Sequence, residues 1–137
     1  MSFLVDTNVL SELTRPAPNA NVLGWTRTLD EFALSVITLE EVSFGLAARP
    51  NMRIAGWFET FIARHCRVLD VTAPIARQAG VLRGGLAARG RPRTQADMLI
   101  AATAAQHGLT LATRNEKDFQ DCGVAILNPF RSSRRGS

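Results

Sequence analysis

Short apolar segments alternate along the chain with longer segments of helical periodicity, and this order constrains the fold more than any other feature of the sequence. The apolar segments, each a predicted strand, lie at residues 2–5, 32–36, 67–71, 109–113 and 124–127. The helical segments are expected at residues 7–14, from Asn19 or Asn21 onward, after Thr38, and at 51–65, 73–86 and 95–107. Strands that alternate with helices are typical of βαβ units and a mainly parallel sheet.

Several predicted strands are almost continuously apolar, as in FALSV at 32–36. Strands of a parallel sheet have this composition because helices cover both faces of the sheet. We therefore expect an α/β fold with three layers, α/β/α, around a central, mainly parallel sheet of four to five strands. One domain should span residues 1–130, and the polar, basic tail at residues 131–137 should be flexible.

The positive charge of the chain comes almost entirely from arginine. Arginine supplies 15 of the 16 basic residues, and Lys117 is the only lysine. Guanidinium groups suit phosphate recognition, so an anionic partner is one explanation. A GC-rich genome that favours arginine codons is another, and composition alone does not separate the two.

Cysteine content and hydropathy indicate a cytoplasmic protein without a membrane segment. Cys66 and Cys122 are the only cysteines, which fits a reducing cytosol better than a disulfide scaffold. The absence of CxxC and of a His-rich segment argues against zinc. Asp6 interrupts the first apolar segment too early for a secretory signal, and the apolar run at 98–105 is too short to span a bilayer.

Four acidic residues stand where predicted strands end or predicted helices begin: Asp6, Glu41, Asp97 and Asp118. Each has a structural explanation when it is taken alone. Asp6 can cap the helix that follows it. Glu41 and Asp97 each stand three residues after a threonine, which is capping-box spacing. Asp118 can satisfy its own backbone in a turn.

Taken together, these acids point to a metal site. In a parallel sheet, ligands bind beyond the carboxyl ends of the strands, where the junctions that carry these acids should meet. Carboxylates that converge repel one another unless protons or cations intervene. Oxygen ligands without histidine or cysteine favour Mg²⁺, with Mn²⁺ as a second choice, over zinc.

The motifs around these acids resemble those of PIN-domain ribonucleases of the VapC toxin type, in particular the FitB-like branch. The resemblance covers residues 2–130 and rests on VDTNVL, SVITLEEVSFG, ADMLIAATA, LATRNEKDF and the closing GVAILNPF. It implies that the metal-binding, catalytic acids are Asp6, Glu41, Asp97 and Asp118. Glu40 is an alternative to the second of these acids, and Asp121 to the fourth. The resemblance also implies a supporting set of polar side chains: Thr7, Asn8, Thr113 and Asn115.

The resemblance implies the toxin of a type II toxin–antitoxin system, acting as a Mg²⁺-dependent endoribonuclease. Its implied partners are an antitoxin protein and RNA, in a homodimer or in a heterotetramer or hetero-octamer with antitoxin, with DNA contacted only through the antitoxin. Four arginines near the acids are candidates for RNA contact, although a solvated loop explains the first three equally well: Arg89, Arg91, Arg93 and Arg114.

Two questions stay open at the level of the sequence. The chain could be a non-catalytic, PIN-like partner of a DNA-binding regulator, or a metal-dependent DNase. A nucleotide-binding α/β protein is disfavoured, because no GxGxxG follows the first strand. The apolar stripe of residues 51–65 could face the core or a second subunit; its members are Ile54, Trp57, Phe58, Phe61 and Ile62.

Overall fold

The computed structural model describes residues 2–131 of the 137-residue chain, so the predicted tail lies outside the described residues except for Arg131. The strands are β1 (Phe3–Val5), β2 (Phe32–Ser35), β3 (Cys66–Leu69), β4 (Thr110–Ala112) and β5 (Ile126–Leu127). The helices are α1 (Thr7–Leu13), α2 (Ala20–Thr26), α3 (Val36–Ala48), α4 (Met52–His65), α5 (Ala73–Ala88) and α6 (Gln95–Gln106), together with the short 3₁₀-helix η1 (Glu116–Phe119). Strands and helices therefore alternate as the apolar pattern predicts.

The five strands form a single parallel sheet in the order β3-β2-β1-β4-β5. The first strand lies at its centre, with Leu4 opposite Ala33 of β2 and Val5 opposite Ala112 of β4. The predicted α/β fold with a mainly parallel sheet is confirmed. Because every strand runs in the same direction, the chain leaves all five strands at the same side of the sheet, where their carboxyl ends lie; we call this side the carboxyl edge.

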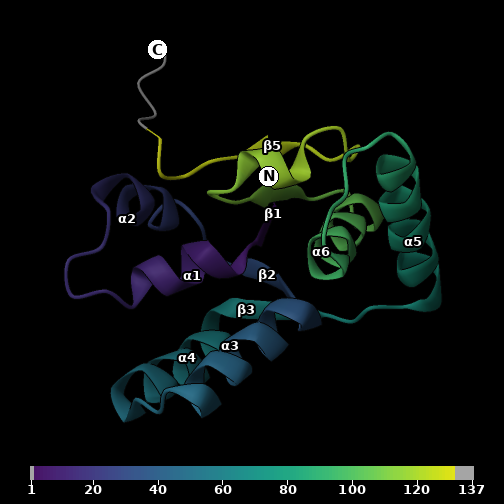
Figure 1. Ribbon diagram of the computed structural model, residues 1–137. Helices are drawn as coiled ribbons and strands as arrows, with labels where there is room; N and C mark the ends of the chain where they lie inside the picture. Colours follow the sequence, from purple (N-terminus) through teal and green to yellow (C-terminus); the bar gives the residue numbers. More distant parts are fainter. Residues whose placement is uncertain (1, 132–137) are drawn as a thin grey trace.

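Each face of the sheet builds its own apolar core, since successive strand side chains point to opposite faces. Leu4 and Ala33 belong to a core that α5 and α6 complete. Val5 and Leu34 belong to a second core, to which α1, α2, α3 and α4 contribute. Figure 1 shows α5 and α6 on one side of the sheet and α1 and α2 on the other. Burying each large apolar side chain contributes about 1.5–3 kcal/mol, so both helical layers stabilise the central strand.

The start of α3 differs from the sequence-based expectation. The helix begins at Val36, because the hydroxyl of Ser35 caps it by accepting a hydrogen bond of 3.0 Å from the amide of Ile37. The expected strand therefore ends one residue earlier, and Thr38 lies inside the helix instead of preceding it. The interpretation of Thr38 and Glu41 as a capping box is wrong for this reason.

The apolar stripe of α4 faces the core, which was one of the two interpretations of its pattern. Phe58 is buried, and the other four members of the stripe pack against the same core. The rings of Trp57 and Phe61 stack with their centroids 4.6 Å apart. The helix runs directly into β3, which starts at Cys66 and ends at Leu69, earlier than the expected end at residue 71.

Cys66 and Cys122 are both free thiols. Within residues 2–131, no helix has the length and apolar character needed to cross a bilayer.

Candidate active site

Asp6 is the first residue after the central strand, and it both caps a helix and sits in a polar cluster. One carboxylate oxygen, Oδ1, accepts a hydrogen bond of 2.8 Å from the amide of Thr7 and so caps α1. The other, Oδ2, accepts bonds from the hydroxyl of Thr113 at 2.8 Å and from Nδ2 of Asn8 at 3.2 Å. The side chain is 5% exposed. The capping explanation is therefore correct, but it accounts for only one of the two oxygens.

Strand register explains why residues more than a hundred positions apart meet here. Val5 pairs with Ala112, so the next residues, Asp6 and Thr113, leave the sheet side by side. The Thr113 hydroxyl also accepts a bond of 3.1 Å from the amide of Asn115, while Asn8 Oδ1 accepts one of 3.1 Å from the amide of Arg114. These bonds join the start of α1 to the segment that follows β4.

Glu41 reaches the same cluster from the second turn of α3. Its Oε1 accepts a hydrogen bond of 2.6 Å from the hydroxyl of Thr7. The helix starts at the carboxyl end of β2, the neighbour of β1, which brings this carboxylate toward the central strand. All four of the polar residues predicted to support the site thus lie around Asp6 or beside it.

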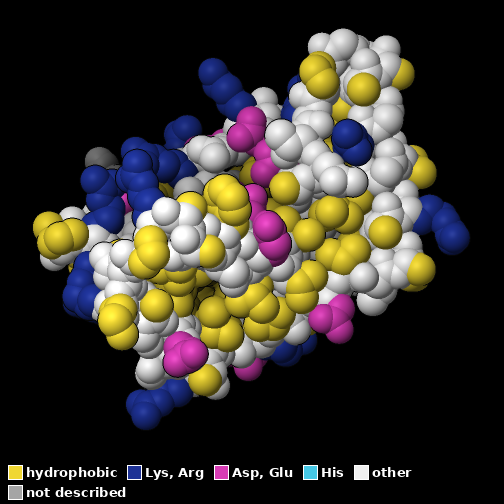
Figure 2. Space-filling model, turned by 60° about the horizontal axis from the view of Figure 1, so that its bottom comes forward, with side chains coloured by type: hydrophobic (Ala, Val, Ile, Leu, Met, Phe, Trp, Pro, Cys, Tyr) yellow, Lys and Arg dark blue, Asp and Glu magenta, His cyan; other side chains and the backbone are white. Residues whose placement is uncertain are grey.

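Asp97 comes from the first turn of α6. Its amide donates to the hydroxyl of Thr94 at 3.1 Å, so the predicted capping role of this threonine is correct. Asp6, Glu41 and Asp97 line one open hollow of about 560 Å³. The other residues that line it are Thr7, Asn8, Ser11, Glu40, Phe44 and Asn115. Figure 2 shows acidic side chains near the middle of one face of the molecule, with apolar side chains beside them and basic side chains gathered to one side.

The surroundings of Asp6 and Asp97 in the hollow disfavour the ionised forms of their carboxyl groups. Burial is the main factor that raises the pKa of Asp6 above its usual value; hydrogen bonds from Thr113, Thr7 and Asn8 oppose this effect, and the charge of Glu41 adds to it. Burial also raises the pKa of Asp97, and the charges of Asp6, Asp118 and Glu41 raise it further. A bound cation would favour the ionised forms of both carboxyl groups and so lower their pKa values.

Asp118 stands apart from the other three acids. It lies in η1 and lines a neighbouring groove of about 400 Å³, together with Arg114, Asn115 and Lys117 among others. Asn115 lines both the hollow and this groove. The charge of Asp118 is nevertheless close enough to raise the pKa of Asp97. Glu40, the alternative to Glu41, is exposed on the rim of the hollow, and Asp121 forms an ion pair with Arg91.

The donor set of the hollow suits a hard cation, because carboxylate, hydroxyl and amide oxygens surround it. Among residues 2–131, no group of three or more His, Cys, Asp or Glu side chains forms a ready-made metal cage. Mg²⁺ does not require one, since it keeps several waters and commonly binds one or two carboxylates together with substrate phosphates. The residues present therefore fit Mg²⁺ or Mn²⁺ better than a metal that prefers nitrogen or sulfur ligands.

The four candidate arginines have different surroundings. The Arg93 guanidinium donates to the carbonyl oxygens of Asp118 at 2.7 Å and Gln120 at 3.1 Å, which ties the start of α6 to η1. Arg91 is paired with an acid, as described above, and Arg89 is exposed. Arg114 is exposed and lines the neighbouring groove, with its guanidinium 4.7 Å from the centroid of the Phe130 ring.

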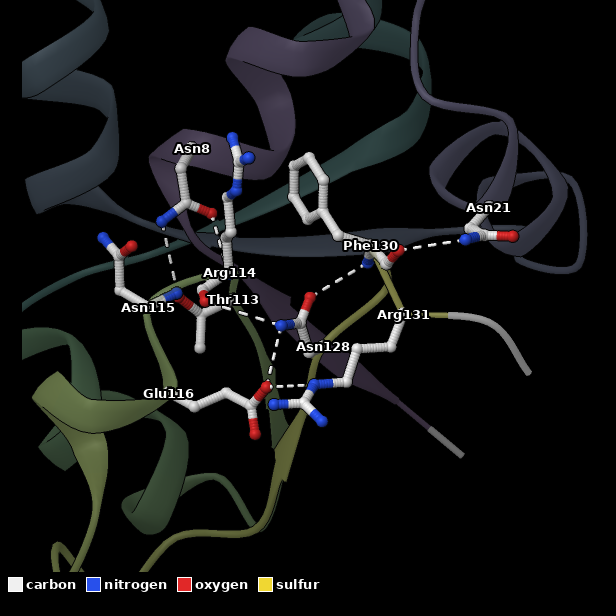
Figure 3. A network of polar contacts seen from close by, with 9 residues as sticks. All are labelled: Asn8, Asn21, Thr113, Arg114, Asn115, Glu116, Asn128, Phe130 and Arg131. Atoms are coloured by element: carbon white, nitrogen blue, oxygen red, sulfur yellow. Dashed lines mark hydrogen bonds and ion pairs between the residues drawn. The ribbon is translucent and has the colours of Figure 1, made fainter. Parts of the chain in front are cut away.

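A network at the carboxyl end of the described chain holds the segment that follows β4, and its only trace in the sequence is the NPF of the last motif. Asn128 donates to Oε2 of Glu116 at 2.8 Å and to the carbonyl of Arg114 at 3.5 Å. Arg131 donates to the same Glu116 oxygen at 2.6 Å. The bond from Asn128 is the main reason why the pKa of Glu116 lies below its usual value. Figure 3 shows the side chains of Asn128 and Arg131 meeting the carboxylate of Glu116, which follows the segment that carries Thr113 and Asn115.

Comparison with known proteins agrees with this architecture. The PIN domain family matches residues 3–124. Toxin FitB of Neisseria gonorrhoeae is 35% identical over 135 residues, which cover 93% of this chain and 97% of that protein. VapC ribonuclease Y4jK of Sinorhizobium fredii is 36% identical over 137 aligned positions, which cover 93% of this chain and 96% of that protein.

The solved structures include close matches to the whole fold. FitAB bound to an IR36 DNA fragment is 34% identical with a TM-score of 0.82, and the match covers 96% of this chain and 98% of that chain. The family match spans every strand but the last, and the relatives extend it over nearly the full length. This chain is a member of the PIN domain family.

Proposed function

We propose that the protein is a Mg²⁺-dependent endoribonuclease and the toxin of a type II toxin–antitoxin system. The observation that carries this proposal is the convergence of Asp6, Glu41 and Asp97 on one hollow at the carboxyl edge of the sheet. Support for the biological role comes from relatives that are named as a toxin and as a VapC ribonuclease. Mn²⁺ is an alternative ion, and we expect the protein to act in the cytoplasm.

Asp6 and Asp97 would hold the ion directly, and Glu41 and Asp118 directly or through water. Bound there, Mg²⁺ supplies Lewis-acid chemistry that lowers the pKa of a coordinated water and offsets the charge that develops on a phosphate. The proximity of the carboxylates agrees with this role, because their mutual repulsion leaves an affinity for cations.

The hydrogen bonds of the site prepare the carboxylates for that task. Three donors fix the Asp6 carboxylate before any ligand arrives, so this side chain loses little conformational freedom when a ligand binds. The Thr7 hydroxyl donates to Oε1 of Glu41 and so orients this carboxylate as well. Such orienting partners commonly contribute 10- to 100-fold, roughly, to metal affinity or activity.

RNA would approach from the side of Arg114. Arg114 and Lys117 both line the groove that adjoins the hollow. The groups of Arg91 and Arg93 are already engaged by Asp121 and by backbone carbonyls, which makes them weaker candidates for phosphate contact than Arg114. Arg89 remains a candidate at the far end of the same loop.

The proposed protein partner is an antitoxin, in a heterotetramer or hetero-octamer that includes a toxin homodimer. The FitAB relative was solved on DNA, which agrees with DNA being contacted through such an assembly. A cationic segment of the antitoxin would compete with Mg²⁺ and RNA for the acidic hollow.

Cleavage of labelled RNA tests the proposal, using the wild-type protein, Asp6→Asn and Asp97→Asn. We expect cleavage only with Mg²⁺ or Mn²⁺, and a loss of about a hundredfold or more in either variant, because each removes a carboxylate from the hollow. Asp70→Asn is the matched control, since Asp70 also follows a strand of the sheet but is exposed outside the hollow. Equal cleavage by all four proteins would overturn the proposal and favour a non-catalytic partner of a regulator.

A further inference from the structure

Phe44 is an exposed aromatic side chain at the rim of the candidate active site. In residues 2–131, the large apolar side chains that are most exposed are Phe44 at 69%, Met52 at 91% and Val81 at 73%. Of these three, Phe44 alone lines the hollow that contains the carboxylates. It belongs to neither apolar core, so packing of the fold does not account for it.

The position of Phe44 on α3 sets its relation to the acids. Residues three and four apart on a helix share a face, so Phe44 lies beside Glu40 and Glu41. The Cα atom of Phe44 lies on the next turn of the helix, about 4.5–6 Å along the axis from the Cα atoms of Glu41 and Glu40. A ligand group bound on Phe44 would therefore be adjacent to the group bound at the acids, and not in its place.

The charge of the hollow decides which ligand group fits the ring. Acidic side chains line the hollow together with the ring, so an uncharged group of RNA suits this place better than a phosphate does. A nucleobase has an uncharged π-face, and stacking of a base on an aromatic side chain gives affinity that varies little with base identity. A base can reach such a ring only when it is not stacked in a duplex.

We propose that Phe44 is a stacking platform for an unpaired nucleobase next to the phosphate at the carboxylates. This inference rests on the proposed function and extends it to how the substrate is positioned. Phe44 is a positioning residue in this account, because it touches a base that flanks the reacting phosphate. An apolar contact with a protein partner is the competing use of the same side chain.

The test compares Phe44→Ala, Phe44→Leu and Phe44→Trp with wild type, with Met52→Ala as the control for an exposed apolar side chain elsewhere. Binding is measured by quenching of 2-aminopurine in a single-stranded oligoribonucleotide, in a background of Asp97→Asn so that cleavage does not interfere. Steady-state cleavage of the same RNA by the five proteins without that background gives KM and kcat. Thermal unfolding checks that each variant is folded.

We expect Phe44→Ala and Phe44→Leu to lose the quenching and to raise KM by about tenfold with little change in kcat, and Phe44→Trp to retain both. Wild-type behaviour of Phe44→Leu would overturn the inference, because leucine preserves an apolar contact but cannot stack. Phe44→Ala that behaves like Met52→Ala would overturn it as well. A wild-type protein that cleaves no RNA overturns the proposed function and this inference together, whereas an active wild type beside an unaffected Phe44→Ala overturns this inference alone.

Discussion

At the scale of single residues, Asp6 shows that capping a helix does not use up a carboxylate. The amide of Thr7 uses Oδ1, and Thr113 and Asn8 use Oδ2. A carboxylate can accept about four hydrogen bonds, so capacity for a further ligand remains. The cap argues neither for nor against a function. What indicates function is that a second and a third acid are brought to the same hollow although one cap needs no such neighbours.

Asp97→Asn should stabilise the metal-free protein at neutral pH. The pKa of Asp97 in the folded protein lies above its ordinary value of about 3.9, because of burial and then of the neighbouring acids. The folded state therefore binds more protons than the unfolded state between the two values, and stability falls as pH rises through that window. Asparagine carries no such charge. Urea unfolding in EDTA should show the variant to be more stable at pH 7 and its advantage to vanish below about pH 4.

The control for this prediction is Asp70→Asn, which removes an exposed acid outside the hollow. It should change stability by less than about 0.5 kcal/mol at either pH. Asp97→Asn that is less stable than wild type at pH 7 in EDTA would show that the charges in the hollow do not repel one another.

The acids were predictable from the sequence as individual residues, but their surroundings were predictable only in part. Asp6, Glu41 and Asp97 are marked by their position at strand and helix ends, and they do meet. Asp118 has the same kind of position, yet the short helix η1 directs it to the adjoining groove. The hydrogen bonds from Asn128 to Glu116 and Arg114 could not be predicted, because they depend on the position of the edge strand β5, which Asn128 follows.

At the scale of elements, the loop before α6 links this helix to η1, and two of its arginines are engaged by contacts within the protein. Arg93 bonds to the backbone of η1, and Arg91 pairs with Asp121 just beyond it. Sequence alone could not separate this arrangement from a solvated loop or an RNA contact, since all three require the same basic residues.

Arg114→Ala should therefore weaken RNA binding, whereas Arg93→Ala should lower the free energy of unfolding. Loss of a phosphate contact reduces the slope of log affinity against log salt by about 0.7–0.9 for single- or double-stranded nucleic acid. We expect that reduction for Arg114→Ala, with stability nearly unchanged. Arg93→Ala should keep the slope and lose about 1.5–3 kcal/mol of unfolding free energy, because it removes charge-assisted bonds to carbonyls. Fluorescence titrations of RNA at several salt concentrations and urea unfolding would measure the two effects, and exchanged phenotypes would contradict these assignments.

The start of α3 provides a separate test at the same scale. Ser35→Ala should lower the unfolding free energy by about 0.5–2 kcal/mol, because the cap of the helix is lost. Thr38→Val should be neutral or slightly stabilising, since the buried Thr38 hydroxyl has no hydrogen-bond partner among the described residues. Urea unfolding measures both. A larger loss in Thr38→Val than in Ser35→Ala would mean that the helix begins where the sequence pattern first suggested.

The error in that helix start has a simple physical cause. Serine and threonine are both good caps, and the sequence offers Ser35 and Thr38 within four residues. The choice is made by the parallel pairing of Ser35 with Leu69 in β3, which fixes where the strand must stop. Local sequence preference does not contain that information.

At the scale of the whole molecule, the order of the strands is what gathers the acids. The segments after β1, β2 and β4 are neighbours only because the sheet is ordered β3-β2-β1-β4-β5. Periodicity predicted the elements and their parallel direction, but strand order depends on long-range pairing, which the sequence pattern does not contain. Glu41 and Asp97 lie on helices from opposite layers, so the hollow exists only when both cores are formed.

The most direct test of the central claim, that these acids form a cation site, is calorimetric titration of Mg²⁺ into the RNA-free protein at pH 7. We predict binding to the wild type and to Asp70→Asn, and loss of that binding in Asp6→Asn and in Asp97→Asn while both variants stay folded. Equal binding by all four proteins, or none by the wild type, would contradict the account.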